Sequence, residues 1–149
     1  MALNLVIGGE AGQGLKKVNN ILSKSLFRLG FNLYSTKNYM SRVRGGHNFM
    51  KIRIGTESVT GPSEEEDILI ALNKETIDLH KDKISEEGII VCDQSLDADN
   101  EKVISLPAKE IARDIGNSKA VNIVFIGSVL KLLGVELDIA KDTLQEYFA

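Results

Sequence analysis

Two kinds of hydrophobic pattern follow one another along the chain. Short apolar runs, typical of buried strands, cover residues 3–8, 31–35, 67–72, 88–92 and 103–106. Segments with apolar residues at helical spacing cover residues 13–29, 74–83, 108–115, 120–133 and the stretch that follows Asp138. Strands that alternate with helices in this way predict an α/β fold, with a mainly parallel sheet between two layers of helices.

Two segments refine this prediction. Residues 47–54 alternate between apolar and polar positions, which predicts a half-exposed strand that is antiparallel or near an edge, so the sheet can be mixed. Residues 120–133 are apolar almost all round, which predicts the most buried helix. We expect residues 1–149 to form a single Rossmann-like domain, a three-layer α/β/α sandwich. Because the last apolar stripe still runs at Ala149, we also expect a domain excised from a longer chain, or a subunit with a short tail.

A glycine-rich stretch joins the first strand to the first helix. Its candidate ligand-binding residues are Gly9, Gly12, Gln13 and Gly14. Glycines let backbone N–H groups approach an oxyanion, and a helix N-terminus adds partial positive charge. The spacing is neither that of the dinucleotide fingerprint nor that of a P-loop. Two interpretations therefore stay open: an anion-binding turn, or a tight connection that merely needs glycine.

A second stretch, residues 39–48, combines arginines, glycines and neutral polar groups. Its candidate binding residues are Ser41, Arg42, Arg44, Gly45, Gly46, His47 and Asn48. Arginine side chains match the geometry of phosphate and carboxylate groups. If the sheet brings this loop near the glycine turn, the two form one anion pocket. Alternatively, the two arginines pair with acidic groups at a subunit interface.

The net charge of −3 conceals a strong asymmetry. Residues 11–56 contain nine Lys and Arg and no acid, whereas residues 57–149 contain 20 acids and nine bases, a net charge of −11. This split favours an anionic ligand or an acidic partner at the first third of the chain. The alternative is a basic surface that serves only solubility. No nucleic-acid-binding motif is present, so we expect no nucleic acid partner.

Few side chains offer catalytic chemistry. The two histidines, His47 and His80, form no recognisable triad, and His80 has the spacing of a packed or surface residue. We interpret residues 64–67, Glu-Glu-Glu-Asp, as a solvated charge run. Residues 34–37 lack the acid expected for a nicotinamide cofactor. With one cysteine and two histidines, metal ligands are sparse, so we expect no metal and no catalytic residue in this domain.

The compartment is indicated by cysteine usage and by the N-terminus. Cys92 lies in an apolar run and is interpreted as a core residue. The chain can form no internal disulfide, which fits a reducing cytoplasm. The N-terminus lacks the features of a signal peptide, and the longest apolar segment, residues 121–134, is short and contains Lys131. We therefore expect a cytoplasmic protein without a membrane span.

Read together, the two glycine-containing stretches are similar to those of a known family. Residues 9–14, residues 39–48 and Ala71-Leu72-Asn73 resemble the gamma domain of 2-oxoacid:ferredoxin oxidoreductases. The likeness continues through Leu106-Pro107-Ala108 and Gly116-Asn117, and it looks closest to the version fused at the N-terminus of the alpha subunit. Lys16, Lys17, Val18 and Asn19 depart from the small or neutral residues that are common after the family's glycine turn.

The resemblance implies a role in oxidative decarboxylation of a 2-oxoacid, such as pyruvate or 2-oxoglutarate, to an acyl-CoA. It implies thiamine diphosphate and iron–sulfur clusters in other domains, thiamine-binding alpha and beta subunits as partners, and ferredoxin as electron acceptor. This domain would bind none of these cofactors itself, although the basic stretch suits the phosphates of coenzyme A. Two other interpretations are a phosphate- or nucleotide-binding module without catalysis and an interaction domain, and a homo-oligomer is left open.

Overall fold

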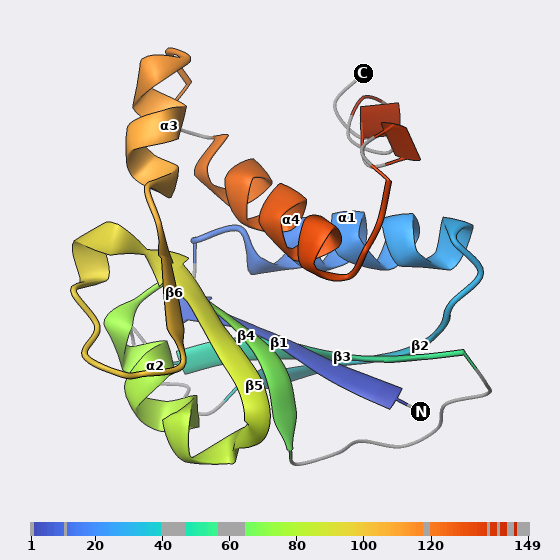
Figure 1. Cartoon of the computed structure of the whole chain (residues 1–149), viewed down its shortest axis with the longest axis horizontal. Coiled ribbons are helices and arrows are strands. Elements are labelled where there is room, and N and C mark those ends of the chain that lie inside the picture. The colour runs from blue at the N-terminus through green and yellow to red at the C-terminus, as the bar shows by residue number, and fades with distance from the viewer. Residues whose placement is uncertain are drawn as a thin grey trace.

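The fold is built on one six-stranded sheet. The computed structural model describes residues 2–10, 12–39, 47–56, 65–117 and 120–136, and residues 138, 139, 141, 142 and 145. The strands lie in the order β2-β3-β1-β4-β5-β6 (Figure 1). They are β1 (Ala2–Glu10), β2 (Asn32–Tyr39), β3 (His47–Gly55), β4 (Glu66–Ala71), β5 (Ile84–Asp93) and β6 (Val103–Leu106).

The sheet is mixed and mostly parallel, which confirms the predicted fold class. β1, β4, β5 and β6 run parallel to one another, whereas β3 is antiparallel to both of its neighbours, β1 and β2. The prediction of an antiparallel strand over residues 47–54 is therefore confirmed, whereas its predicted half-exposure is wrong, and β3 is the second strand from the edge. Its residues are mostly buried because β1 and β2 flank it and α1 contacts it.

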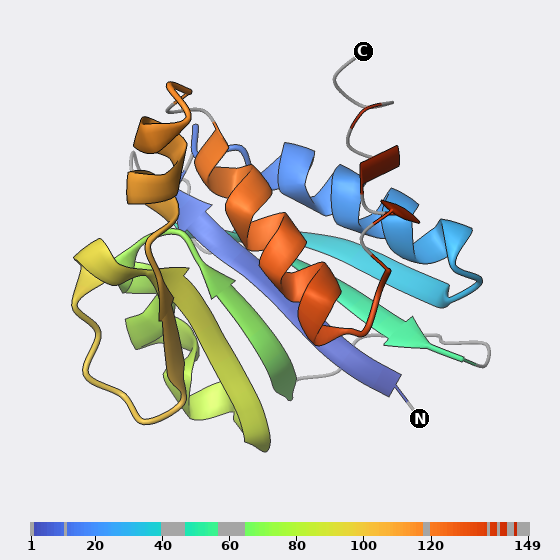
Figure 2. The same cartoon turned by 45° about the horizontal axis from the view of Figure 1, so that its top comes forward.

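Helices cover both faces of the sheet, as the three-layer prediction requires. On one face lie α1 (Leu15–Arg28) and α4 (Val121–Leu132), and on the other lies the short α2 (Lys74–His80) (Figures 1 and 2). The larger core cluster packs residues of α1 and α4 on β1, β3 and β4. The smaller cluster joins α2 to the opposite side of the sheet. The remaining helix, α3 (Ala108–Asp114), follows β6 and contacts α4.

Predictions about individual elements need correction. β2 continues to Tyr39, beyond the strand expected over residues 31–35. The helix expected over residues 74–83 ends at His80 and continues as a 3-10 turn, η1 (Lys81–Lys83), which leads into β5. β5 begins at Ile84, ahead of the apolar run 88–92, because the polar residues 85–87 hid its first half from a hydrophobicity pattern. Finally, α4 is not the most buried helix: it buries four of its 12 residues, whereas α1 buries seven of 14.

The helices of the described ranges are short. None of them is both long and apolar enough to cross a membrane. The longest, α1, ends where Gly30 adopts a positive φ of 89°, as its glycine predicted.

Candidate functional site

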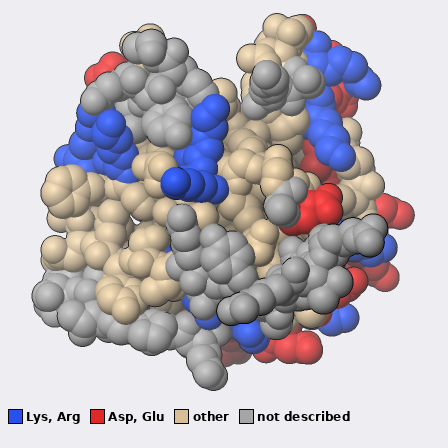
Figure 3. All heavy atoms as spheres, turned by 180° about the vertical axis from the view of Figure 1, so that it is seen from behind, with Lys and Arg blue, Asp and Glu red and all other residues tan. Residues whose placement is uncertain are grey.

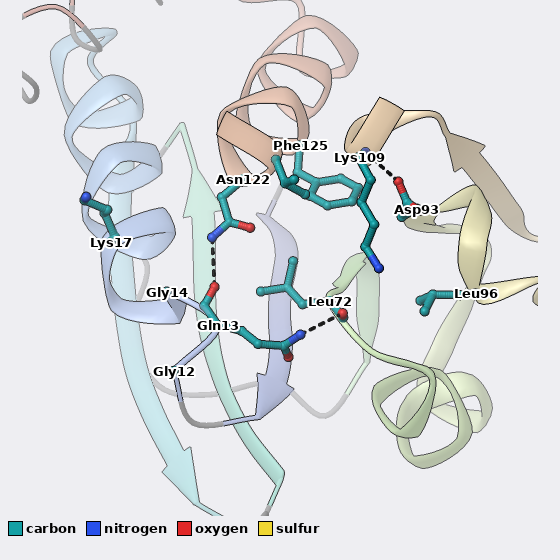
Figure 4. A pocket seen from close by; sticks show the side chains of 11 residues that line it. Gly12, Gln13, Gly14, Lys17, Leu72, Asp93, Leu96, Lys109, Asn122 and Phe125 are labelled. Atoms are coloured by element: carbon teal, nitrogen blue, oxygen red, sulfur yellow. Dashed lines mark hydrogen bonds between the residues drawn. The ribbon is translucent and has the colours of Figure 1, made fainter. Parts of the chain in front are cut away.

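A pocket of about 490 Å³ lies at the carboxyl ends of β1, β4 and β5. Its walls come from the glycine turn, the residues that follow the two other strands, and the first turns of α1, α3 and α4 (Figure 4). The lining residues are Gly12, Gln13, Gly14, Lys17, Leu72, Asp93, Leu96, Lys109, Val121, Asn122 and Phe125. This edge of an open α/β sheet is where ligands are generally bound, and the volume is in the range of small-molecule sites.

The glycine turn needs glycine for backbone reasons. Gly12 and Gly14 have φ angles of 91° and 82°, in the left-handed region that side chains disfavour. A Cβ at Gly14 would also come within 2.8 Å of the Asn122 amide nitrogen. Gly14 is the N-cap of α1 and supplies no side-chain cap, and the first turn holds no acidic residue. The positive end of the α1 dipole is therefore not neutralised by an acid in its own first turn.

Gln13 ties the turn to two other elements. Its side-chain oxygen accepts a hydrogen bond from the Glu10 backbone N–H at 2.8 Å, and its nitrogen donates to the Leu72 carbonyl at 3.1 Å. Asn122, in the first turn of α4, donates to the Gln13 carbonyl at 2.8 Å (Figure 4). The turn is thus held between the end of β4 and the start of α4, which gives the pocket floor a defined shape.

Asp93 fixes the opposite wall. Its carboxylate accepts hydrogen bonds from the backbone N–H groups of Ser95 and Lys109, both at 2.9 Å. Burial opposes ionisation, but hydrogen bonds from Ser95 and Lys109, together with the Lys109 charge, outweigh it, so the pKa of Asp93 lies below its usual value. Asp93 thus joins the end of β5 to the first turn of α3 and stays ionised.

Two lysines contribute positive charge at the pocket. Lys109, from α3, extends among the other lining side chains, whereas Lys17, from α1, lies at the outer edge of the lining, away from them (Figure 4). On the face seen in Figure 3, Lys and Arg side chains gather in two groups, one over α1 and one near α3. With the backbone of the glycine turn between them, these cations form the electrostatic environment that phosphate or carboxylate groups prefer.

A second polar cluster lies on the α2 side of the sheet. His47 and His80 face each other with their Nε2 atoms 2.7 Å apart, and His80 Nδ1 contacts both Glu66 oxygens, at 2.9 and 2.8 Å. All three side chains are buried, with exposed fractions of 2% or less. Burial, reinforced by the charges of His80 and Lys83, lowers the pKa of His47 to about 4.

This cluster corrects one interpretation of the sequence and confirms another. Glu66 is not part of a solvated charge run, because its carboxylate is fully buried against His80. His80 is a packed residue with a specific partner on each ring nitrogen. No sequence pattern indicated this pairing, since Glu66 and His80 are 14 positions apart and belong to different elements. Cys92 is buried, as predicted, and burial raises the pKa of its thiol.

The structure separates the predicted site residues into three groups. Gly12, Gln13 and Gly14 line the pocket, and Gly9 lies beside it at the end of β1. His47 and Asn48 begin β3, where they pair with Glu10 and Gly9. The remaining predicted residues, Ser41, Arg42, Arg44, Gly45 and Gly46, lie outside the described residues. The single pocket formed by both loops therefore stays a prediction.

Most of the pocket lining was not predicted from the sequence, including Asp93, Lys109 and Asn122. Asp93 carried a usable signal, because it directly follows a buried strand of a parallel sheet, where ligand-binding side chains gather. Lys109 and Asn122 carried none, since each stands near the start of a helix whose position over the sheet could not be known. Among the residues described, no group of three or more His, Cys, Asp or Glu side chains could hold a metal ion.

The fold and the pocket define a Rossmann-like α/β domain with a ligand-sized site at the strand ends. Two solved structures share this fold. A 2-oxoglutarate:ferredoxin oxidoreductase from Magnetococcus marinus, with 2-oxoglutarate, coenzyme A and succinyl-CoA bound, superimposes with a TM-score of 0.84 at 23% identity, over 99% of this chain and 27% of that one. The gamma subunit of a keto/oxoacid ferredoxin oxidoreductase from Geobacter sulfurreducens gives 0.80 at 21% identity, over 97% and 83% of the two chains.

Residues 4–149 match the family Pyruvate ferredoxin/flavodoxin oxidoreductase, and the chain belongs to this family. Ketoisovalerate oxidoreductase subunit VorA from Methanothermobacter thermautotrophicus is 29% identical over 149 residues, 96% of this chain and 31% of the relative. 2-Oxoglutarate synthase subunit KorC from Archaeoglobus fulgidus is 24% identical over 136 residues, 90% of this chain and 72% of the relative. A 2-oxoacid:ferredoxin oxidoreductase alpha subunit from Sulfolobus is 31% identical over 80 residues, and the match covers 13% of its length.

Proposed function

We propose that this chain is the gamma-type domain of a 2-oxoacid:ferredoxin oxidoreductase, which converts a 2-oxoacid to an acyl-CoA and passes electrons to ferredoxin. The family match over residues 4–149 carries this proposal. Relatives of similar sequence are subunits of oxidoreductases, and a protein of the same fold is a gamma subunit. The proposed complex acts in the cytoplasm, as the cysteine usage predicts.

Within this complex, the pocket at the strand ends receives a phosphate group of coenzyme A. The fit rests on the donor set: Lys109 among the lining side chains, Lys17 at their outer edge, and backbone N–H groups in a turn where Gly12 and Gly14 leave room for a ligand. A volume of about 490 Å³ accommodates part of a cofactor of that size. The solved relative from Magnetococcus marinus, of the same fold, has coenzyme A bound.

The redox chemistry belongs to partner subunits. One cysteine cannot hold an iron–sulfur cluster that needs four thiolates, so the clusters lie on other subunits of the complex, as does thiamine diphosphate. The chain contributes binding and orientation of coenzyme A. It packs on the thiamine-binding alpha and beta subunits.

Reconstitution of the complex tests this function. The 149-residue chain is co-expressed with the thiamine-binding and iron–sulfur subunits of a 2-oxoacid:ferredoxin oxidoreductase from its own organism, and 2-oxoacid-dependent reduction of ferredoxin is measured with and without coenzyme A. We expect an iron-containing complex whose activity requires both this chain and coenzyme A. A chain that stays a monomer, while the other subunits retain full activity, contradicts the proposal and favours an independent phosphate-binding module.

A further inference from the structure

The buried cluster of Glu66, His80 and His47 is not explained by coenzyme A binding. It lies on the α2 side of the sheet, whereas the pocket is lined by α1, α3 and α4. Its members come from three elements: Glu66 begins β4, His80 ends α2 and His47 begins β3. Three ionisable groups enclosed together are costly unless their charges and protons are matched, so their arrangement restricts the protons they can hold.

The hydrogen bonds run in one line from the carboxylate to the second histidine. Both Glu66 oxygens lie within 2.9 Å of His80 Nδ1, which must therefore carry a hydrogen to donate. Along the contact between the two Nε2 atoms, at 2.7 Å, only one nitrogen can carry a hydrogen. The line ends at His47 Nδ1, which is buried and has no hydrogen-bond partner among the described residues.

We propose that Glu66 and His80 are positioning residues that hold His47 as a neutral imidazole with its hydrogen on Nδ1. Glu66 supplies the negative charge that a buried cation requires, so His80 is the imidazolium and donates through both ring nitrogens. His47 Nε2 is then the acceptor, and the only hydrogen of the neutral ring is on Nδ1. His47 thus carries a buried N–H donor on Nδ1.

The same geometry makes the donor reversible. If His80 loses its Nε2 proton, His47 takes the opposite tautomer and donates through Nε2, which leaves a lone pair on Nδ1. One proton therefore changes His47 Nδ1 from a donor to an acceptor, although the two rings keep their places. The lowered pKa of His47 agrees with a ring that does not take a second positive charge beside His80.

In the part of the chain that the structure describes, few other charged groups act on the cluster of Glu66, His80 and His47. Lys83, in η1, is a further cation that acts on His47. Lys51, in β3, lies over the Phe49 ring at 5.7 Å from its centre, and this ring stacks on His47. Thr76, in α2, contributes an uncharged hydroxyl near Gly8. Glu66 is the carboxylate in hydrogen-bond contact with the His80 ring in this part of the structure.

Histidine NMR tests the proposal on the full chain. Because His47 and His80 are the only histidines, selective ¹⁵N-histidine labelling gives four ring signals. At neutral pH we expect two protonated nitrogens on His80, a protonated Nδ1 on His47 and a bare Nε2 on His47. In Glu66→Gln the His80 charge is no longer compensated, so His47 should switch to a bare Nδ1 and a protonated Nε2. Glu65→Gln, which removes an exposed charge from the neighbouring residue, should leave the wild-type pattern.

A neutral His80 in the wild-type chain, or a His47 tautomer that Glu66→Gln leaves unchanged, overturns the proposal. The wild-type spectrum alone decides the matter if Glu66→Gln does not fold. The solvent exchange rate of the His47 Nδ1 hydrogen identifies the acceptor class. Slow exchange indicates a protein oxygen, and fast exchange indicates a water molecule. Whether this exchange is slow or fast, the tautomer of His47 is the observation that supports or overturns the proposal.

Discussion

Glu10, the last residue of β1, lies directly opposite His47, the first residue of β3. The chain therefore enters β3 beside the glycine turn, and Gly9 and Gly8 pair with Asn48 and Phe49 in the same register. This pairing places Glu10 and His47 at the same end of the sheet as the glycine turn. The next aromatic residue of β3, Phe49, packs against the rings of His47 and His80.

The close packing at Gly8 predicts a costly substitution. A Cβ at this position would lie 2.5 Å from the Thr76 methyl group and 3.0 Å from His47 Cε1, so Gly8→Ala forces β1 and α2 apart. We expect a loss of about 1–3 kcal/mol in the free energy of unfolding, measured by denaturant titration. The matched control is Gly127→Ala in α4, where a Cβ meets nothing within 4 Å and the better helix propensity should add roughly 0.5–1 kcal/mol. Equal stabilities for the two variants would contradict this packing.

His47 predicts a dependence of stability on pH. Its pKa is about 4 in the folded chain, against 6.5 for an unperturbed histidine side chain, so the unfolded chain binds more protons between these values. The free energy of unfolding should therefore fall as the pH drops from 6.5 to 4, by at most about 3 kcal/mol from this residue. The check is a series of denaturant titrations across this range.

A variant isolates this histidine from the other acids and bases. In His47→Gln the loss of stability between pH 6.5 and 4 should be smaller than in the wild-type chain, because one proton-binding difference has been removed. The absolute stability at pH 7 is compared separately, since the substitution also changes packing. Identical slopes for the two chains would show that His47 does not carry the effect.

Asp93 predicts a cost for losing one acceptor. Asp93→Asn presents an amide NH₂ to one of the two backbone N–H groups that the carboxylate now accepts, those of Ser95 and Lys109. One buried donor then loses its partner, which costs about 1–3 kcal/mol. The control is Asp114→Asn, the same substitution at an exposed position of α3. It should have little effect on thermal or chemical unfolding. A similar small effect for both variants would argue against the role of Asp93 in holding α3.

The fold was largely predictable because apolar runs and helical spacing reflect burial, and burial defines the layers. The errors occur where local pattern and tertiary packing disagree. Polar residues 85–87 lie in the first half of β5, so that half was not predicted. In α4, several apolar residues are only half-buried in the structure, so its apolar pattern overstated its burial. The glycine turn was predictable because left-handed backbone conformations need glycine locally, as at Gly12 and Gly14.

The rest of the site depends on contacts distant in sequence. Asn122 reaches the Gln13 carbonyl across 109 positions, and no periodicity encodes such a contact. Glu66 is one of four consecutive acidic residues, a pattern typical of a solvated surface. Only the position of α2 shows that Glu66 is buried against His80. Sequence patterns thus predicted the glycine turn of the pocket. The opposite wall of the pocket and the histidine cluster could be recognised only from the three-dimensional arrangement of the strands and helices.

The Michaelis constant for coenzyme A in the reconstituted complex tests the central claim most directly. Lys17→Ala and Lys109→Ala each remove a cation that lines the pocket, and each should raise the constant about tenfold, equivalent to ~1.4 kcal/mol. Lys16→Ala removes the same charge from the same turn of α1 at an exposed position outside the pocket lining, and should leave it within about twofold. Unchanged constants in both pocket variants, or an equal rise with Lys16→Ala, would contradict coenzyme A binding at this site.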